Sequence, residues 1–207
     1  KSYKHYIDKW AKEIAEHPAP FVGISCFSYR SLPTLKYLSP LIRKYSPNKK
    51  IIVGGSPVYT YHDWIINNNL ADYAVSNEGE NALLDILYNK CNPGHIMRPQ
   101  IEDLNALPKP DYSGFDFDRY VPRDPGGLRV RDKDYTRDSY EAGIMGSRGC
   151  VRRCTFCDVE TFYPKFRWRS AESIYDEMLH LLDKGINHIY FFDSLINGNQ
   201  KELEKLC

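Results

Sequence analysis

The chain has 207 residues, enough for one large domain or two small ones, and a formal net charge of +1. Because positive and negative charges nearly balance, there is no electrostatic reason to expect nucleic acid or an anionic membrane as a partner. The sequence contains no run of about eighteen apolar residues and no visible signal peptide, so no transmembrane helix is predicted.

Up to residue 97 the sequence alternates between helical and strand patterns. Apolar residues at helical spacing predict helices at residues 3–16, 31–45, 62–68 and 77–87. Short apolar runs, typical of buried parallel strands, lie at residues 21–27, 50–53 and 71–75. Pro40 lies inside the second helix and predicts a kink there. Repeated strand–helix units predict an α/β fold, in which helices cover the faces of a parallel sheet.

Three turns of this region follow predicted strands, and open α/β sheets bind ligands at that edge. Ser25 offers a hydroxyl, and Gly54-Gly55 lets the backbone approach a bulky ligand closely. Glu78-Gly79-Glu80 opens a helix whose free N–H groups can bind polar ligand atoms. Each motif taken alone is ordinary turn chemistry, so a purely structural role stays open.

The composition of residues 98–138 predicts a connector between two domains. The segment 107–112 is stiffened by prolines, 124–127 is a turn cluster, and the alternating charges of 129–137 suggest an exposed hairpin or loop. A linker with no further role is the favoured interpretation.

A second strand–helix–strand pattern follows. A strand is expected at residues 141–145, and Ser170 is expected to cap a helix that Gly185 ends. The buried stripe of that helix is predicted to hold Ile174, Met178, Leu181 and Leu182. The next strand, residues 188–193, places Asp193 at its carboxyl end, where β/α barrels carry their catalytic groups.

Between these elements lie three cysteines, Cys150, Cys154 and Cys157, with the spacing C-x3-C-x2-C. Three thiolates can hold three irons of a [4Fe–4S] cluster and leave the fourth iron without a protein ligand. A structural zinc site needs four ligands, and only Asp158 is near enough to serve as the fourth. A disulfide would leave one thiol over. Few cysteines, three of them clustered, fit a reducing cytoplasm.

This loop resembles the cluster loop of the radical S-adenosylmethionine (SAM) enzymes, in which SAM chelates the open iron and is cleaved to a 5′-deoxyadenosyl radical. The resemblance implies that Phe156 shields the cluster and flanks the adenine. It also implies that Asp193 and Ser194 contact the ribose or amino acid portion of SAM. Arg169 is a weaker candidate for the SAM carboxylate, because guanidinium groups suit carboxylates, and a surface position is its alternative.

With the turns upstream, the chain resembles a radical SAM subfamily (class B-like) whose barrel follows a cobalamin-binding domain. Asn77 departs from that subfamily's Gly-Glu-Gly-Glu motif, and the D-x-H-x-x-G motif of other cobalamin proteins is absent. A histidine from that motif is therefore not expected on cobalt. The resemblance implies cobalamin contacts at Ser25, Gly54, Gly55, Ser56, Glu78, Gly79 and Glu80.

The chain covers only part of the family's length, so a fragment is expected. Residues 1–97 are expected to form a partial Rossmann-like, cobalamin-binding-type sheet without its first strand and helix. Residues 139–207 are expected to form the first units of a radical SAM partial β/α barrel.

The implied function is SAM cleavage by a [4Fe–4S] cluster, followed by cobalamin-dependent methyl transfer to an unreactive carbon in the cytoplasm. One alternative is a radical SAM enzyme without cobalamin that cyclises or rearranges its substrate. Another is a non-catalytic iron–sulfur or zinc module. The implied partners are a small-molecule or natural-product-like substrate and an electron donor such as flavodoxin or ferredoxin, with no nucleic acid and no membrane.

Overall fold

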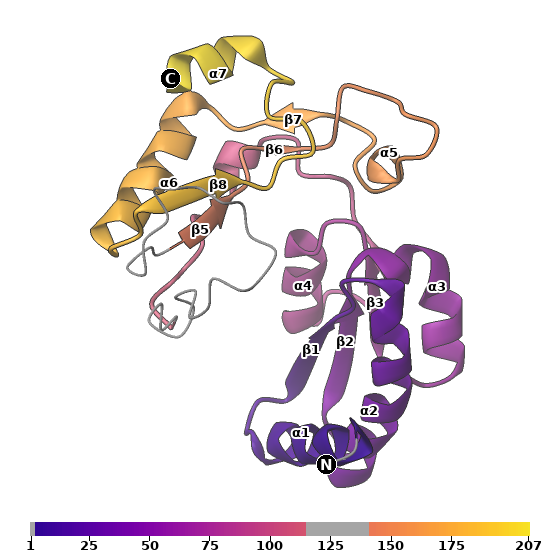
Figure 1. Ribbon diagram of the computed structural model, residues 1–207. Helices are drawn as coiled ribbons and strands as arrows, with labels where there is room; N and C mark the ends of the chain where they lie inside the picture. The colour runs from indigo at the N-terminus through magenta and orange to yellow at the C-terminus, as the bar shows by residue number, and fades with distance from the viewer. Residues whose placement is uncertain (1–2, 115–140) are drawn as a thin grey trace. The chain divides into compact units, whose positions relative to one another are not determined.

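The computed structural model describes residues 3–114 and 141–207. These residues form two compact units, Lys1–Ile101 and Glu102–Cys207 (Figure 1). The predicted turn at 124–127 and the predicted hairpin or loop at 129–137 lie outside the described residues.

The first unit is a four-stranded parallel sheet in the order β1-β2-β3-β4. Its strands are β1 (Phe21–Ser25), β2 (Lys50–Gly54), β3 (Tyr73–Ser76) and β4 (Gly94–Met97). Its helices are α1 (Tyr3–Glu16), α2 (Leu32–Tyr45), α3 (Ser56–Asn67) and α4 (Glu80–Leu87), with a 3-10 turn, η1, at Tyr29–Ser31.

Side chains of β2 and β3 alternate between two hydrophobic clusters, one on each face of the sheet. Ile51, Val53 and Ala74 pack with α1, α2 and α3, whereas Ile52 and Val75 pack with α4. Both strands are buried on both faces, as their continuous apolar sequences predict. The sheet is therefore the middle layer of an α/β/α unit (Figure 1).

Several details of this unit differ from the sequence-based expectation. β1 is only partly buried, because it is an edge strand of this sheet. α3 begins at Ser56 rather than near residue 62, since Pro57 is favourable in a first turn. α4 buries Ala82 and Ile86. The leucines expected in its buried stripe are about half exposed: Leu83 (43%), Leu84 (50%) and Leu87 (43%).

The second unit contains the parallel pair β5 (Glu141–Ile144) and β8 (His188–Phe191). A short antiparallel ribbon, β6 (Ser147–Arg148) with β7 (Arg167–Trp168), was not predicted. The helices are α5 (Val159–Phe162), α6 (Ala171–Asp183) and α7 (Gln200–Leu206), with a 3-10 turn, η2, at Leu104–Ala106.

Helix α6 packs its apolar side against β5. Ser170 caps it by accepting a hydrogen bond from the N–H of Ser173 at 3.1 Å, and Gly185 follows its end with φ of 84°. Ile174 and Leu181 are buried as expected, but Leu182 is exposed, and Glu177, which was not expected in the stripe, is buried. The predicted strand–loop–helix–strand unit is therefore present, with one charged residue in its apolar stripe.

Among the described residues, none of the helices combines the length and the apolar character that crossing a bilayer requires.

Candidate functional site

Two of the predicted ligand-binding turns lie side by side at the carboxyl edge of the first sheet. Ser25, the last residue of β1, is the register partner of Gly54, the last residue of β2. The N–H of Cys26 donates to the carbonyl oxygen of Gly54 at 2.7 Å. The hydroxyl of Ser56 donates to the carbonyl oxygen of Phe27 at 3.1 Å. The structure thus brings Ser25, Gly54, Gly55 and Ser56 together.

Gly55 is required by the protein's own backbone. Its φ is 106°, in the region that favours glycine, and an added Cβ would lie 2.1 Å from the carbonyl oxygen of Cys26. The sequence suggested that Gly55 makes room for a ligand, whereas the structure gives a reason internal to the fold. Burial raises the pKa of the neighbouring Cys26 thiol, which therefore behaves as a small apolar side chain.

The third turn is also fixed from within the first unit. The Glu78 carboxylate is buried and accepts a hydrogen bond from the N–H of Ile101 at 2.7 Å. Asn77 has φ of 63°, a conformation that asparagine adopts more readily than other non-glycine residues. This explains how Asn77 can stand where the subfamily motif has glycine.

The edge nevertheless leaves room for a ligand. A Cβ added to Gly79 would meet no atom within 4 Å, and one added to Gly54 would meet only a backbone oxygen at 3.9 Å. Ligand atoms can therefore approach both glycines without displacing side chains. The α4 helix begins directly after Gly79 and carries Glu80 in its first turn. Open glycines beside the Ser25 and Ser56 hydroxyls are compatible with a large ligand such as a corrinoid.

In the second unit, the cysteine loop is exposed. Cys150 is partly buried, Cys154 and Cys157 are exposed, and all three are free thiols. Residues 151–158 are all exposed. The loop contains a turn in which the N–H of Cys157 donates to the carbonyl oxygen of Cys154 at 3.0 Å.

The three thiols do not converge on one point. Within residues 3–114 and 141–207, no three His, Cys, Asp or Glu side chains are grouped as a metal site would need. The donor set still fits an iron–sulfur cluster in its chemistry, because three unpaired thiols follow one another on one loop. The Phe156 ring between the last two cysteines is 88% exposed and so belongs to no core.

Asp193 and Ser194 follow β8 and face different surroundings. The Asp193 carboxylate accepts hydrogen bonds from the N–H of Gly146, at 3.0 Å, and from the hydroxyl of Ser147. Ser194 is exposed. Ser194 therefore presents its side chain to solvent, whereas Asp193 is partly buried and bonded to the loop before Cys150.

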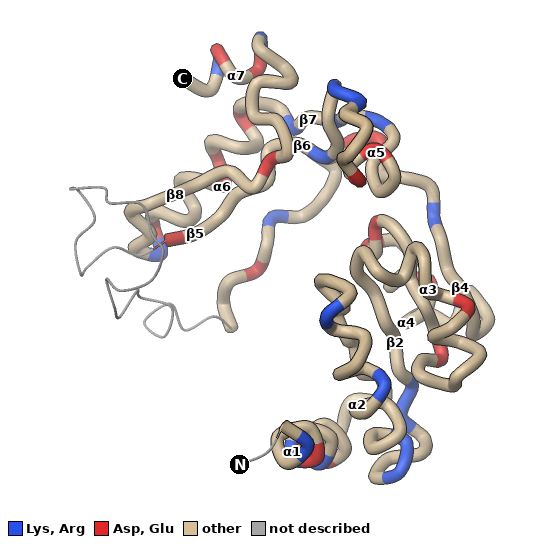
Figure 2. Tube along the Cα trace, turned by 45° about the vertical axis from the view of Figure 1, so that its right-hand side comes forward, with Lys and Arg blue, Asp and Glu red and all other residues tan. Residues whose placement is uncertain are grey.

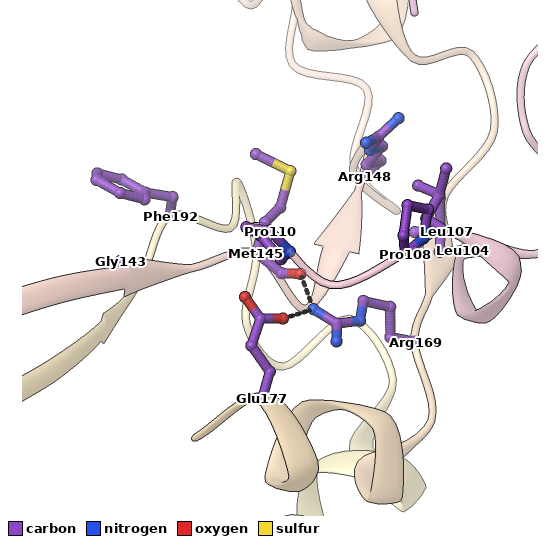
Figure 3. A pocket seen from close by; sticks show the side chains of 10 residues that line it. All are labelled: Leu104, Leu107, Pro108, Pro110, Gly143, Met145, Arg148, Arg169, Glu177 and Phe192. Carbon is purple, nitrogen blue, oxygen red and sulfur yellow. Dashed lines mark hydrogen bonds and ion pairs between the residues drawn. The ribbon is translucent and has the colours of Figure 1, made fainter. Parts of the chain in front are cut away.

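Arg169 is not the surface residue that the sequence allowed as its alternative. Its guanidinium pairs with Glu177, and it also donates to the carbonyl oxygen of Met145 at 3.2 Å (Figure 3). The two charged groups border a cavity of about 250 Å³, whose other walls are apolar apart from Arg148. The lining residues are Leu104, Leu107, Pro108, Pro110, Gly143, Met145, Arg148, Arg169, Glu177 and Phe192.

Sequence reasoning did not identify Glu177, Gly146 or Ser147 as part of the site. One signal was available for Glu177, which lies three residues after Ile174 and four before Leu181, within the apolar stripe of α6. A charged residue at such a position has to be paired, and Arg169 is its partner.

Comparisons with known proteins match both units. The B12 binding domain family model matches residues 3–87, and the Radical SAM superfamily model matches residues 144–205. A cytidylyl-2-hydroxyethylphosphonate methyltransferase from Streptomyces wedmorensis is 28% identical over 106 residues, 50% of this chain and 19% of the relative. A tRNA-2-methylthio-N(6)-dimethylallyladenosine synthase from Hydrogenobaculum sp. is 33% identical over 201 residues, 91% of this chain and 40% of the relative.

A solved structure shares the fold. It is the radical S-adenosylmethionine methyltransferase TsrM from Kitasatospora setae with tryptophan and a SAM analogue bound. It superimposes with a TM-score of 0.61 at 18% identity, over 100% of this chain and 42% of that one. The chain thus spans less than half the length of each of these relatives.

Proposed function

The chain belongs to the radical SAM superfamily and carries a B12-binding domain before its radical SAM segment, and from this premise we propose that the full-length protein is a cobalamin-dependent radical SAM methyltransferase. The observation that carries the proposal is that one chain joins the three-cysteine loop to an α/β edge with open glycines. The proposed reaction is methyl transfer to an unreactive carbon.

In this proposal Cys150, Cys154 and Cys157 hold three irons of a [4Fe–4S] cluster and leave the fourth for SAM. When bound, the cluster would supply the electron that cleaves SAM, and cobalamin would supply the methyl group. The exposed Phe156 ring would cover the cluster and flank the adenine, and the exposed Ser194 hydroxyl would contact SAM. Asp193 and Arg169 were also candidates for SAM contact, but both side chains are engaged by groups within the second unit.

Cobalamin binding is proposed at the carboxyl edge of the first sheet. Ser25 and Ser56 provide hydroxyls there, and Gly54 and Gly79 provide backbone that a ligand can approach closely. Gly55 and the Glu78 carboxylate shape the edge through contacts within the protein. The acidic Glu80 lies at the start of α4. The proposed contacts are Ser25, Gly54, Gly55, Ser56, Glu78, Gly79 and Glu80.

The proposed partners are a small-molecule or natural-product-like substrate and an electron donor such as flavodoxin or ferredoxin. Figure 2 shows basic and acidic residues interspersed along both units. Arg152 is exposed two residues before Cys154, where positive charge would steer an acidic donor toward the cluster. The net charge of +1 does not rule out nucleic acid, because one relative is named as a tRNA-modifying enzyme. A cytoplasmic location is proposed because free thiols persist in reducing compartments.

Metal analysis with an absorbance spectrum tests the proposal. Full-length protein produced with ample hydroxocobalamin and reconstituted anaerobically should contain one cobalt and one four-iron cluster. The variant in which Cys150, Cys154 and Cys157 are all changed to Ala should keep its cobalt and lose its iron. Iron without cobalt would favour a radical SAM enzyme that works without cobalamin. Zinc in place of iron would favour a binding module.

A further inference from the structure

We propose that Asp193 and Arg169 are positioning residues that hold the stem of the cysteine loop, residues 145–149, and thereby place Cys150. The stem joins the end of β5 to the first cysteine. The inference rests on the proposed function in one respect, namely that Cys150 ligates a cluster. It assigns both charged side chains to contacts within the protein instead of contacts with SAM.

Asp193 uses both of its carboxylate oxygens on the stem. Oδ2 accepts from the N–H of Gly146 at 3.0 Å, and Oδ1 accepts from the hydroxyl of Ser147. Ser147 is 3% exposed, so its hydroxyl needs an acceptor within the protein. Hydrogen bonds to an ionised carboxylate are roughly twice as strong as neutral ones. One side chain after β8 therefore fixes two consecutive residues of the stem.

Arg169 fixes the stem through its backbone and its side chain. Its N–H donates to the carbonyl oxygen of Gly146 at 2.8 Å, and Nη1 donates to that of Met145 at 3.2 Å. Nε donates to the hydroxyl of Ser173 at 3.3 Å, and Nη2 donates to the carbonyl oxygen of Ser173 at 3.0 Å. All three guanidinium nitrogens are thus engaged within the second unit, and none is left to form a fork with a SAM carboxylate.

The ion pair with Glu177 makes it unfavourable for the Arg169 guanidinium to leave these contacts and bind a ligand instead. Its side chain is 3% exposed, that of Arg169 is 14% exposed, and the two are joined by an ion pair (Figure 3). A SAM carboxylate that took the guanidinium would leave Glu177 buried and unpaired, which is strongly unfavourable. The pair therefore favours a structural role for Arg169.

The rest of the stem is held by backbone contacts. Ser147 and Arg148 pair with Trp168 and Arg167 in the β6–β7 ribbon. Gly149 has φ of 93°, and an added Cβ would lie 2.7 Å from the carbonyl oxygen of Lys165. The chain is thus fixed up to the residue before Cys150, whereas residues 151–158 are exposed. The stem places the first thiol, and the exposed part of the loop carries the other two.

Two measurements on the full-length protein separate positioning from SAM contact. The first is the alkylation rate of Cys150 in the cluster-free protein, followed by mass spectrometry. Asp193→Ala should raise this rate about tenfold, because losing hydrogen bonds to a charged group releases the stem. Asp193→Asn should restore the slow rate, since its amide oxygen can accept from Gly146 and its NH2 group can donate to Ser147.

The second measurement is the EPR spectrum of the reduced cluster before SAM is added. Asp193→Ala should alter this spectrum, and Asp193→Asn should leave it close to wild type. Ser194→Ala is the matched contrast at the next position. It should keep the SAM-free spectrum and the slow Cys150 alkylation, and change only the response to SAM.

Leu181→Ala controls for loss of stability, because Leu181 is buried in the same core and lies outside the stem contacts. If Leu181→Ala raised the alkylation rate of Cys150 as much as Asp193→Ala does, the positioning role would be overturned. So would an Asp193→Ala protein with wild-type alkylation and a wild-type SAM-free spectrum that fails to respond to SAM. A wild-type protein without iron would refute the proposed function, while the alkylation rates would still decide the inference.

Discussion

The carboxyl edge of the first sheet and the stem of the cysteine loop are both held in place, but by different means. At the edge, Gly55 and Asn77 adopt backbone conformations with φ of 106° and 63°. At the stem, hydrogen bonds from the side chains of Asp193 and Arg169 hold the backbone. Backbone shape depends on residue size, whereas the stem depends on side chains that can accept and donate its hydrogen bonds. The first region should therefore be sensitive to added volume, and the second to the loss of hydrogen-bonding groups.

The largest expected effect is that of Gly55→Val. The new Cβ would overlap the carbonyl oxygen of Cys26, at 2.1 Å, and the φ of 106° is strained for valine. We expect a loss of about 4 kcal/mol or more in the free energy of unfolding of the first unit, with loss of cobalamin binding as a consequence. Urea unfolding monitored by hydrogen exchange of the β1 and β2 peptides would measure it.

Gly54→Ala is the matched control, because its Cβ would make an ordinary contact at 3.9 Å. Its stability should stay within about 1 kcal/mol of wild type. If this variant folds normally and still loses cobalamin, ligand contact at Gly54 is supported. A Gly55→Val protein of wild-type stability would contradict the close approach to Cys26.

The next largest effect tests the buried ion pair between Arg169 and Glu177. Glu177→Ala removes the buried partner of Arg169 and leaves its guanidinium uncompensated. We expect a loss of about 3–5 kcal/mol in the second unit, measured by denaturant unfolding. Glu177→Gln should lose less, since its amide oxygen can still accept from Arg169. Glu172→Ala, exposed on the same helix, should stay within about 1 kcal/mol, and an equal loss there would argue against a special role for Glu177.

A smaller effect is expected where a side chain holds the first unit. Glu78→Ala removes the carboxylate that accepts from the N–H of Ile101, at a cost of about 1–3 kcal/mol. Glu78→Gln keeps an acceptor oxygen and should be nearly as stable as wild type. Stability and cobalamin affinity measured on both variants separate structure from ligand contact. Normal stability in Glu78→Ala would show that Glu78 does not hold this segment.

The sequence predicted the family and the fold class, and both are confirmed. Cysteine spacing and apolar periodicity are local patterns, which is why they could be read without a structure. The reason for Gly55 could not be read, because the oxygen it avoids belongs to Cys26, 29 residues earlier. Strand β4 was missed because it is an edge strand that buries only Ile96, so its sequence has no apolar run. The β6–β7 ribbon was missed because two residues per strand are too few for a periodicity.

The smallest expected effect is a pH dependence of the first unit that arises from His95. Nε2 of His95, on β4, lies 2.8 Å from the hydroxyl of Ser76, and its ring stacks on that of His62 with centroids 3.7 Å apart. Burial, and then the charge of His62, lower the pKa of His95, while Asp63 acts in the opposite direction.

Because the pKa of folded His95 lies below its unfolded value of about 6.5, the unfolded chain binds more protons in this range. The contribution of His95 to the free energy of unfolding should therefore be fully present above about pH 6.5 and decrease as the pH drops toward the folded pKa. Urea unfolding midpoints at about pH 7.5 and about pH 5 should differ in the wild type and differ less in His95→Gln, which keeps a hydrogen-bonding group for Ser76. An unchanged difference in His95→Gln would assign the pH dependence to other groups. A smaller difference in His95→Gln would assign the pH dependence to His95 on β4.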